Sequence, residues 1–466
     1  MAVLRPAVSE AVLKTLPPQP DASVVKLSEE GEEEEVYLDL LARGRVVGPN
    51  WSDDDDATGV VGAWEAAWRA SPLVMHDAGL VAVAEATCPD LAYLSAPVSI
   101  DTIGLVLENH PGPVGCLRVD ASNPSPEIME GWMDIIRAKE EDREDAGGGE
   151  RELMLLNTTQ AGPRAKNYLF PLGCLPRGLT KLTLGFVAVD PLEAVHLTNL
   201  AQLTMTSCAF CGQKLSALLP ALHSLTRLVL GCCYLTPNTG PAPADLTVVS
   251  STLTRLEMSN CKASAGLNLQ YTPRLAILCT GLLPRHAGAR LLIHMINPVA
   301  LRELHGVMLH HHDIDLVTYQ RRKTIRGFPS LPNLATLRVC LHMATSQQTL
   351  NLLRLLKCMP RLTRLILTLV DDTRAPEDVP PQPAFDAISC IANSLQQLTL
   401  DRFLGGEAEI VFATRVLAAA ARLASLMLRP HMKLPRDQAA AAVNALLECP
   451  RAAPACVVDL ATVPLD

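Results

Sequence analysis

Four cysteines stand close together in one part of the sequence, and cysteine is a residue type that binds metal ions. The stretch MTSCAFCGQKL, residues 205–215, holds the C-x-x-C pair Cys208 and Cys211, and the adjacent pair Cys232 and Cys233 follows it. Zinc sites of the ribbon type use two C-x-x-C pairs, so one such pair followed by C-C is an incomplete pattern. The residue types alone leave two interpretations open, half of a zinc site or thiols that the fold requires.

Two further clusters carry metal-binding residue types without the spacing that a metal site needs. Residues 310–313 read HHHD, but successive side chains point in different directions, so at most two of the three histidines would meet one ion. Residues 53–56 are four aspartates, and they lack the spacing and the glycine of a calcium loop. A metal-dependent enzyme is therefore only a remote alternative. We expect no catalytic residues, no cofactor and no metal, because the sequence also lacks a phosphate-binding loop and a nucleophile elbow.

The composition favours a reduced intracellular protein built from aliphatic layers. Hydrophobic residues make up 48% of the 466 residues but aromatic residues only 4%. The 14 cysteines are scattered along a chain without an export signal, so we expect free thiols and a cytoplasmic or nuclear location. Every long aliphatic segment is interrupted by Arg, Asp, His or Pro, which argues against a membrane span.

Charge differs between the two parts of the chain. Residues 1–150 hold 10 Lys and Arg against 29 Asp and Glu, a balance of −19, whereas residues 151–466 hold 30 against 20, a balance of +10. The basic residues of the second part are spread out and have no aromatic residues between them. We therefore expect no nucleic-acid binding.

A leucine phrase of the form L-x-x-L-x-(L/M/V) recurs from residue 179 onward at intervals of 21 to 33 residues, counting two weaker copies at Leu275 and Leu301. The eight full copies begin at Leu179, Leu200, Leu225, Leu253, Leu334, Leu362, Leu395 and Leu423. This spacing is typical of leucine-rich repeats, in which each unit is one strand and a return segment, and stacked units share a core. The prediction is an α/β leucine-rich-repeat solenoid with a curved parallel sheet.

The return segments are predicted to differ from coil to coil. Residues 349–360 and 409–423 have the apolar spacing of helices, whereas residues 236–247 and 371–385 are rich in proline and should be irregular.

Three cysteines occupy one position of the repeat. Cys208, Cys233 and Cys261 each stand three residues after the last apolar residue of their phrase. Leucine-rich repeats place a small buried Asn or Cys there, so these residues should form a structural column with one member per coil. Cys211 and Cys232 receive no role from the repeat.

The middle residue of each L-x-L should point away from the core, because side chains alternate along a strand. These outward residues are the predicted protein-binding face. They are Thr183, Thr204, Val229, Glu257, Arg338, Ile366 and Thr399.

Several stretches resemble the plant F-box proteins with leucine-rich repeats, particularly the large set found in grasses. They are CPDLAYLSAP (residues 88–97), VLENHPGPVGCLRV (residues 106–119) and FPSLPNLATLRVCL (residues 328–341). Residues 394–428 are similar to the FBD-type C-terminal module of that group, with a strand, an aromatic-Leu-Gly-Gly turn, a glutamate, a helix and a final strand.

The resemblance implies an N-terminal F-box that docks on a Skp adaptor, and here that module departs from the family pattern. Trp64 and Trp68 match the W-x-x-x-W at the exit of the F-box, and Leu40 lies in a remnant of its first helix. An acidic segment, LSEEGEEEEVYLDLLARGRVVGPNWSDDDD, stands where the apolar docking helix is expected.

Four regions follow from this comparison. They are an acidic, partly disordered region with the F-box remnant (1–63), the F-box exit and first irregular repeats with a charged linker at 140–152 (64–150), the repeats (151–393) and the FBD-like repeats with a cap (394–466).

The predicted function is a non-catalytic protein-recognition scaffold that binds a protein on its concave face. The resemblance implies the substrate-binding subunit of a Skp-cullin-F-box ubiquitin ligase. The alternative is a free leucine-rich-repeat binding module without ligase activity.

Overall fold

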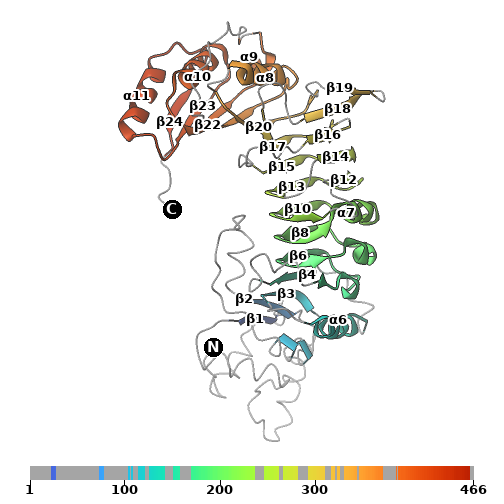
Figure 1. Cartoon of the computed structure of the whole chain (residues 1–466). Coiled ribbons are helices and arrows are strands. Elements are labelled where there is room, and N and C mark those ends of the chain that lie inside the picture. Colours follow the sequence, from blue (N-terminus) through green and yellow to red (C-terminus); the bar gives the residue numbers. More distant parts are fainter. Residues whose placement is uncertain are drawn as a thin grey trace, which may run out of the picture. The chain divides into compact units, whose positions relative to one another are not determined.

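The leucine phrases form parallel strands in a computed structural model of the chain (Figure 1). The structure describes residues 23–27, 73–77, 103–104, 107–108, 114–120, 125–141, 151–157, 169–236, 246–261, 266–281, 292–296, 298–309, 316–320, 323–325, 330–343, 346–370, 385 and 387–461. Contacts between residues divide the chain into two units. Unit 1 comprises residues 1–225 and 229–236, and unit 2 comprises residues 226–228 and 237–466. Strand β10 (Arg227–Gly231) contributes residues to both.

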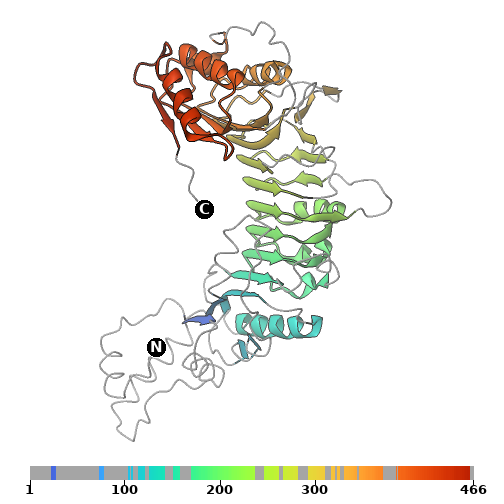
Figure 2. The same cartoon turned by 60° about the vertical axis from the view of Figure 1, so that its left-hand side comes forward.

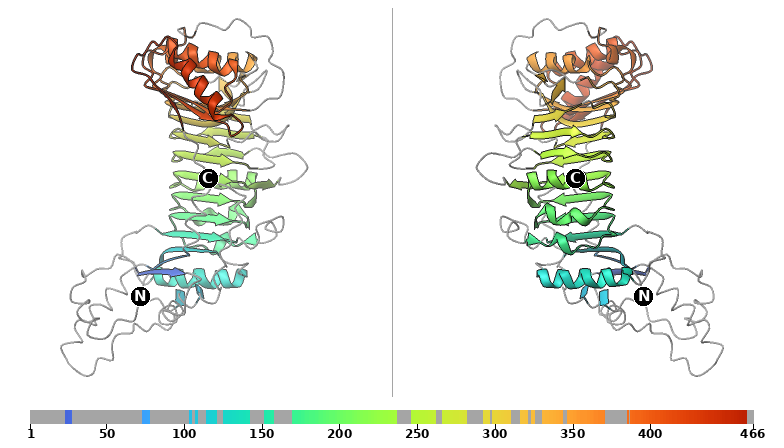
Figure 3. Two further views of the ribbon diagram at one scale, coloured as in Figure 1. Left: turned by 90° about the vertical axis from the view of Figure 1, so that its left-hand side faces the viewer. Right: turned by 90° about the vertical axis from the view of Figure 1, so that its right-hand side faces the viewer.

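Unit 1 contains two sets of parallel strands, one on each side of the coils. Its main strands are β1 (Ser23–Leu27), β2 (Leu73–Asp77), β3 (Val114–Asp120), β4 (Glu152–Leu156), β6 (Lys181–Gly185) and β8 (Gln202–Thr206). Its second set is β5 (Leu169–Phe170), β7 (Ala188–Val189), β9 (Ala209–Cys211) and β11 (Tyr234–Thr236). Helix α6 (Pro126–Glu141) lies beside β3 and β4 (Figure 3), and α7 (Gly212–Leu218) follows β9.

Unit 2 repeats this arrangement of main strands and a second set of strands. They are β13 (Arg255–Ser259), β15 (Ile277–Thr280), β17 (Glu303–Met308), β20 (Thr336–Leu341), β21 (Arg364–Leu369), β22 (Gln397–Phe403), β23 (Ser425–Pro430) and β24 (Val457–Leu460). The second set is β12 (Leu246–Val249), β14 (Gly266–Tyr271), β16 (Leu292–Met295) and β18 (Leu316–Gln320), and β19 (Lys323–Ile325) closes it as an antiparallel edge.

Helices replace the second set of strands toward the C-terminal end of unit 2. They are α8 (Ser346–Leu356), α9 (Ser389–Asn393), α10 (Glu407–Ala419) and α11 (Arg436–Leu447). Figure 2 shows α10 and α11 on one face of the sheet formed by β22, β23 and β24. The two return segments predicted as helices are confirmed as α8 and α10, within a few residues of the predicted bounds.

The predicted leucine-rich-repeat solenoid is confirmed, but the strands in the return segments of the middle coils were not foreseen. Their sequences alternate as strands do. In β14, Leu267 and Leu269 are buried and Asn268 between them is only half-buried. Buried and half-buried side chains that alternate every second residue are typical of a strand, not of a helix.

One backbone conformation recurs where the chain leaves a main strand. Five non-glycine residues adopt a left-handed conformation with φ between 51° and 62°, namely Phe186, Ser207, Cys232, Asn260 and Arg402. Each occupies the same repeat position, directly before the site of the Asn or Cys. In unit 1, the N–H of Ser207 donates to the carbonyl of Gly231 at 2.7 Å and the N–H of Tyr234 to the carbonyl of Cys208 at 2.8 Å, so the turn hydrogen-bonds one coil to the next.

The aromatic-Leu-Gly-Gly turn before α10 is held by a buried carboxylate. The Oε2 atom of Glu409 accepts hydrogen bonds from the N–H groups of Leu404 and Gly405, both at 2.9 Å. Gly405 has φ +75°, a conformation that glycine adopts without strain. Burial raises the pKa of Glu409, while the backbone hydrogen bonds oppose that shift.

The described helices include none that is long and apolar enough to cross a bilayer.

Candidate protein-binding surface

The main strands present alternate residues to the core and to the opposite face. In β13, Leu256 and Met258 are fully buried, whereas Arg255 and Glu257 are partly exposed. The seven predicted contact residues all lie on main strands at the outward position. Six are partly exposed, but Thr399 is only 7% exposed and offers little surface to a partner.

The outward face of unit 1 is largely uncharged at these positions. Thr183 on β6 and Thr204 on β8 are register partners, and Thr183 also faces Met154 on β4, which is buried. These positions can offer hydrogen bonds and methyl groups. Charge enters the same face two residues earlier along the strands, where Glu152 on β4 and Lys181 on β6 are register partners.

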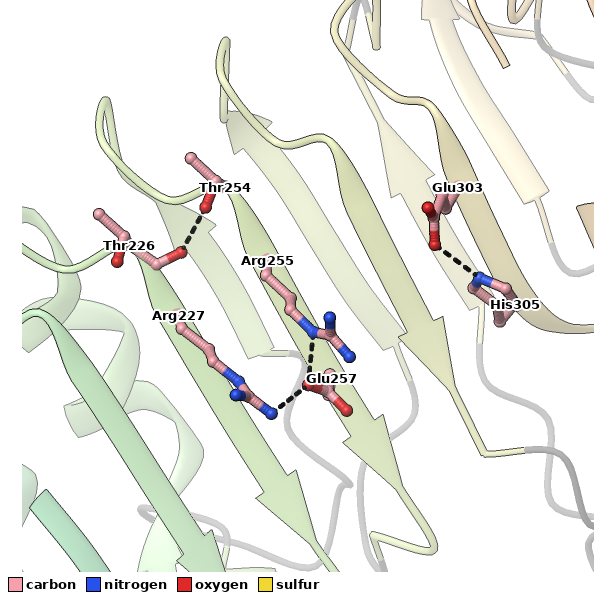
Figure 4. A network of polar contacts seen from close by, with 7 residues as sticks. All are labelled: Thr226, Arg227, Thr254, Arg255, Glu257, Glu303 and His305. Atoms are coloured by element: carbon pink, nitrogen blue, oxygen red, sulfur yellow. Dashed lines mark hydrogen bonds and ion pairs between the residues drawn. The ribbon is translucent and has the colours of Figure 1, made fainter. Parts of the chain in front are cut away.

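The outward face of unit 2 carries an ion-pair cluster centred on Glu257 (Figure 4). One carboxylate oxygen, Oε1, accepts from Arg227 Nη2 at 3.0 Å and from Arg255 Nε at 2.7 Å. The arginine side chains are 43% and 40% exposed, whereas that of Glu257 is 21% exposed. The hydrogen bond that Arg255 donates to Glu257 raises the pKa of the Arg255 guanidinium. Both arginine side chains are thus more exposed than the carboxylate to which they donate.

The cluster continues across the next two strands. Cys279 on β15 is the register partner of Glu257 and of His305 on β17. Burial, and then the charge of Glu257, raises the pKa of the Cys279 thiol to about 11. The thiol is therefore neutral near pH 7 and is a poor nucleophile. On β17, His305 Nε2 lies 3.3 Å from Glu303 Oε2.

A second network fixes Arg338 across three strands. Its Nη2 donates to Asp401 Oδ2 at 2.5 Å, and its Nε donates to Thr368 Oγ1 at 3.2 Å. The hydroxyl of Thr368 in turn donates to Asp401 Oδ2 at 3.4 Å. The side chains of Arg338 and Asp401 are only 24% and 17% exposed, so most of this network's hydrogen bonding is internal.

A glycine sets the course of the strand that carries Glu303 and His305. Gly306 has φ +84°, and the pairing of β17 with β20 shifts at this residue. A Cβ atom at Gly306 would lie 1.6 Å from the carbonyl oxygen of Thr280. The Thr280 hydroxyl donates to the carbonyl of His305 at 3.1 Å, which joins the bulge to β15.

The three repeat-register cysteines, Cys208, Cys233 and Cys261, are buried. Cys208 and Cys233 are fully buried and Cys261 is 5% exposed. The thiol of Cys208 donates to the carbonyl of Leu184 at 3.4 Å, and that of Cys233 to the carbonyl of Met205 at 3.2 Å. Burial raises the pKa of Cys208 to about 12. The thiols of Cys208 and Cys233 are thus directed at backbone of the preceding coil.

The two cysteines without a predicted role, Cys211 and Cys232, stand at defined backbone positions. Cys232 is one of the left-handed residues described above, and Cys211 is the residue before the first turn of α7. Within the described parts of the chain, no group of three or more His, Cys, Asp or Glu side chains is arranged to hold a metal ion. The HHHD and four-aspartate clusters, and the predicted F-box remnant residues Leu40, Trp64 and Trp68, lie outside the described residues.

A family model of leucine-rich repeats matches residues 144–367, and its description reads "FBD-associated F-box protein At5g56370, LRR repeats". The comparison with curated proteins gave no match. The predicted resemblance to plant F-box proteins with leucine-rich repeats is confirmed over this range. The matched range includes the outward charged residues from Arg227 to Arg338. The FBD-like module (394–466), the F-box remnant and the domain boundaries stay predictions.

Proposed function

We propose that this protein-interaction scaffold selects substrates for a Skp-cullin-F-box ubiquitin ligase, because its residues 144–367 match the leucine-rich-repeat model of an FBD-associated F-box protein. The match to a repeat family of F-box proteins is the observation that carries the proposal. The outward strand face binds the substrate protein, and the N-terminal region around Trp64 and Trp68 contacts the Skp adaptor. We propose that the protein acts in the cytoplasm or the nucleus.

The geometry of unit 2 suits protein recognition. The leucines behind each strand are fully buried, so the strands form a rigid support, and the charged side chains on them are held by partners on neighbouring strands. Groups that are already ordered lose little conformational entropy when a partner binds. Charges arranged in this way steer the encounter and favour one register of the partner. None of these features requires a chemical step.

Co-purification with a Skp-type adaptor tests the ligase role. The full chain and the adaptor are co-expressed and separated by size-exclusion chromatography, and circular dichroism verifies that the chain is folded. We expect a stable complex that is lost in the double variant Trp64→Ala, Trp68→Ala. The matched control, Tyr271→Ala, removes an exposed aromatic side chain from β14 in the repeats and should leave the complex intact.

Failure of the folded wild-type chain to bind any Skp-type adaptor would refute the ligase role. The free binding module would then be the better description. The acidic run at residues 32–35 favours that alternative, because acidic side chains oppose the burial that an adaptor contact needs.

A further inference from the structure

The structure points to a defined charge pattern in the partner: we propose that unit 2 binds a partner segment whose acidic side chain lies on Arg227 and Arg255 and whose basic side chain lies on Glu303. The inference deepens the proposed function and rests on its premise that the strand face binds protein. It states which side chains the bound segment carries and which residues of the strand face they contact. Figure 4 shows Arg227, Arg255 and Glu303 on that face.

The two arginines form a socket for one carboxylate. A guanidinium has five N–H donors, and Glu257 accepts one from each arginine, both on the same oxygen. Because the arginines are about twice as exposed as Glu257, an approaching partner meets guanidinium groups first. Two arginines and one glutamate leave a formal charge of +1. This balances a single carboxylate, whereas a phosphate would bring about −1.5 to −2.

The strand between the socket and Glu303 carries no charge on this face. Ile277 on β15 is the register partner of both Arg255 and Glu303, and it is partly exposed. Next to it on the same strand, Cys279 is partly buried and neutral near pH 7. The surface therefore changes from positive through apolar to negative over three neighbouring strands.

Glu303 offers an exposed carboxylate in a fixed place. Its side chain is 43% exposed, whereas that of His305, which contacts it, is 20% exposed. The bulge at Gly306 sets the position of His305 by its hydrogen bond to Thr280. A lysine or arginine of the partner can pair with Glu303 from the open side.

The distance between the two ends of this pattern selects the spacing in the partner. Arg255 and Glu303 are two strands apart in register, which corresponds to roughly 9.6 Å at about 4.8 Å per strand. A polyproline-II segment advances about 3.1 Å per residue and repeats every three residues, so residues three apart lie on one side and about 9.3 Å from each other. The expected partner motif is an acidic and a basic residue separated by two others.

Selection from a displayed peptide library by the immobilised full chain tests this inference. The wild-type chain should enrich peptides with an acidic and a basic residue three positions apart over those two or four apart. Glu303→Lys should change the preferred pair to two acidic residues. Arg255→Gln should weaken the affinity for a selected peptide about threefold to tenfold. Arg422→Glu, an exposed arginine away from the strand face, is the matched control and should leave the selection unchanged.

The possible outcomes separate the inference from its premise. Enriched peptides whose binding ignores both Arg255→Gln and Glu303→Lys would overturn the inference and leave protein binding intact. No enrichment by folded wild-type chain would overturn the premise as well. Tighter binding after phosphoserine replaces the acidic residue of a selected peptide would overturn the assignment of a carboxylate. The adaptor plays no part in this assay, so a negative adaptor result does not affect it.

Discussion

Replacing Gly306 with alanine should destabilise unit 2 strongly. The backbone at this residue has φ +84°, where a side chain costs about 1–2 kcal/mol. The new Cβ atom would also lie 1.6 Å from the carbonyl oxygen of Thr280. No rotamer can relieve a contact between Cβ and backbone, so β17 must move away from β15. That movement breaks the hydrogen bond from the Thr280 hydroxyl to the carbonyl of His305, which contributes about 1 kcal/mol to stability.

Together these terms give an expected loss of about 3 kcal/mol or more in the free energy of unfolding, large for a single methyl group. Urea denaturation followed by circular dichroism measures it. The matched control is Gly131→Ala in α6, where an added Cβ meets nothing within 4 Å. Alanine is the better helix former, so the control should gain about 0.5–1 kcal/mol. If Gly306→Ala lowers the free energy of unfolding by less than about 1 kcal/mol, the close approach of Gly306 to Thr280 does not constrain β17.

Two other substitutions and one labelling experiment test the remaining features. Burial raises the folded-state pKa of Glu409 above 4.5. The stability that Glu409 contributes is therefore present below about pH 4.5 and is lost as the pH rises through the folded-state pKa. Glu409→Gln should remove this change, so that the free energy of unfolding varies less with pH across that range. Arg338→Ala should cost about 1–3 kcal/mol in urea denaturation, because the mostly covered Asp401 would lose its charged partner and keep only the Thr368 hydroxyl. Cys208 should resist thiol reagents in the native chain at pH 8 and react after unfolding, as mass spectrometry of labelled peptides would show.

The sequence predicted the inward pattern of the fold because that pattern is local. The L-x-L phrase specifies two buried side chains and one outward side chain within three residues, so Glu257 and Arg338 were placed on the face without a structure. Their partners were not predicted. Arg227 and Asp401 come from other coils, and only the register of neighbouring strands shows which outward residues meet. The burial of Thr399 also depends on such neighbours.

The left-handed position had no signal in residue type. It is occupied by Phe186, Ser207, Cys232, Asn260 and Arg402, which share neither size nor charge. Only asparagine among these is enriched in that conformation. The tertiary hydrogen bonds on either side therefore impose the conformation, and a pattern search over residue types cannot detect it. The cysteines were predictable because three successive full copies of the leucine phrase have the same residue type, a small one that suits burial, at one position.

The separation between inward and outward positions explains how such a scaffold can change partners without losing its fold. In β13, Leu256 and Met258 account for the buried apolar surface, and full burial of such side chains contributes about 1.5–3 kcal/mol each. The exposed pairs of Arg227 and Arg255 with Glu257 contribute about 1 kcal/mol or less. Substitutions at the outward positions therefore alter recognition at small cost to stability. The network of Arg338 and Asp401 is an exception, because its groups are mostly covered and each depends on the other. Changes in specificity should accordingly concentrate on the strands that carry Arg255, Ile277 and Glu303.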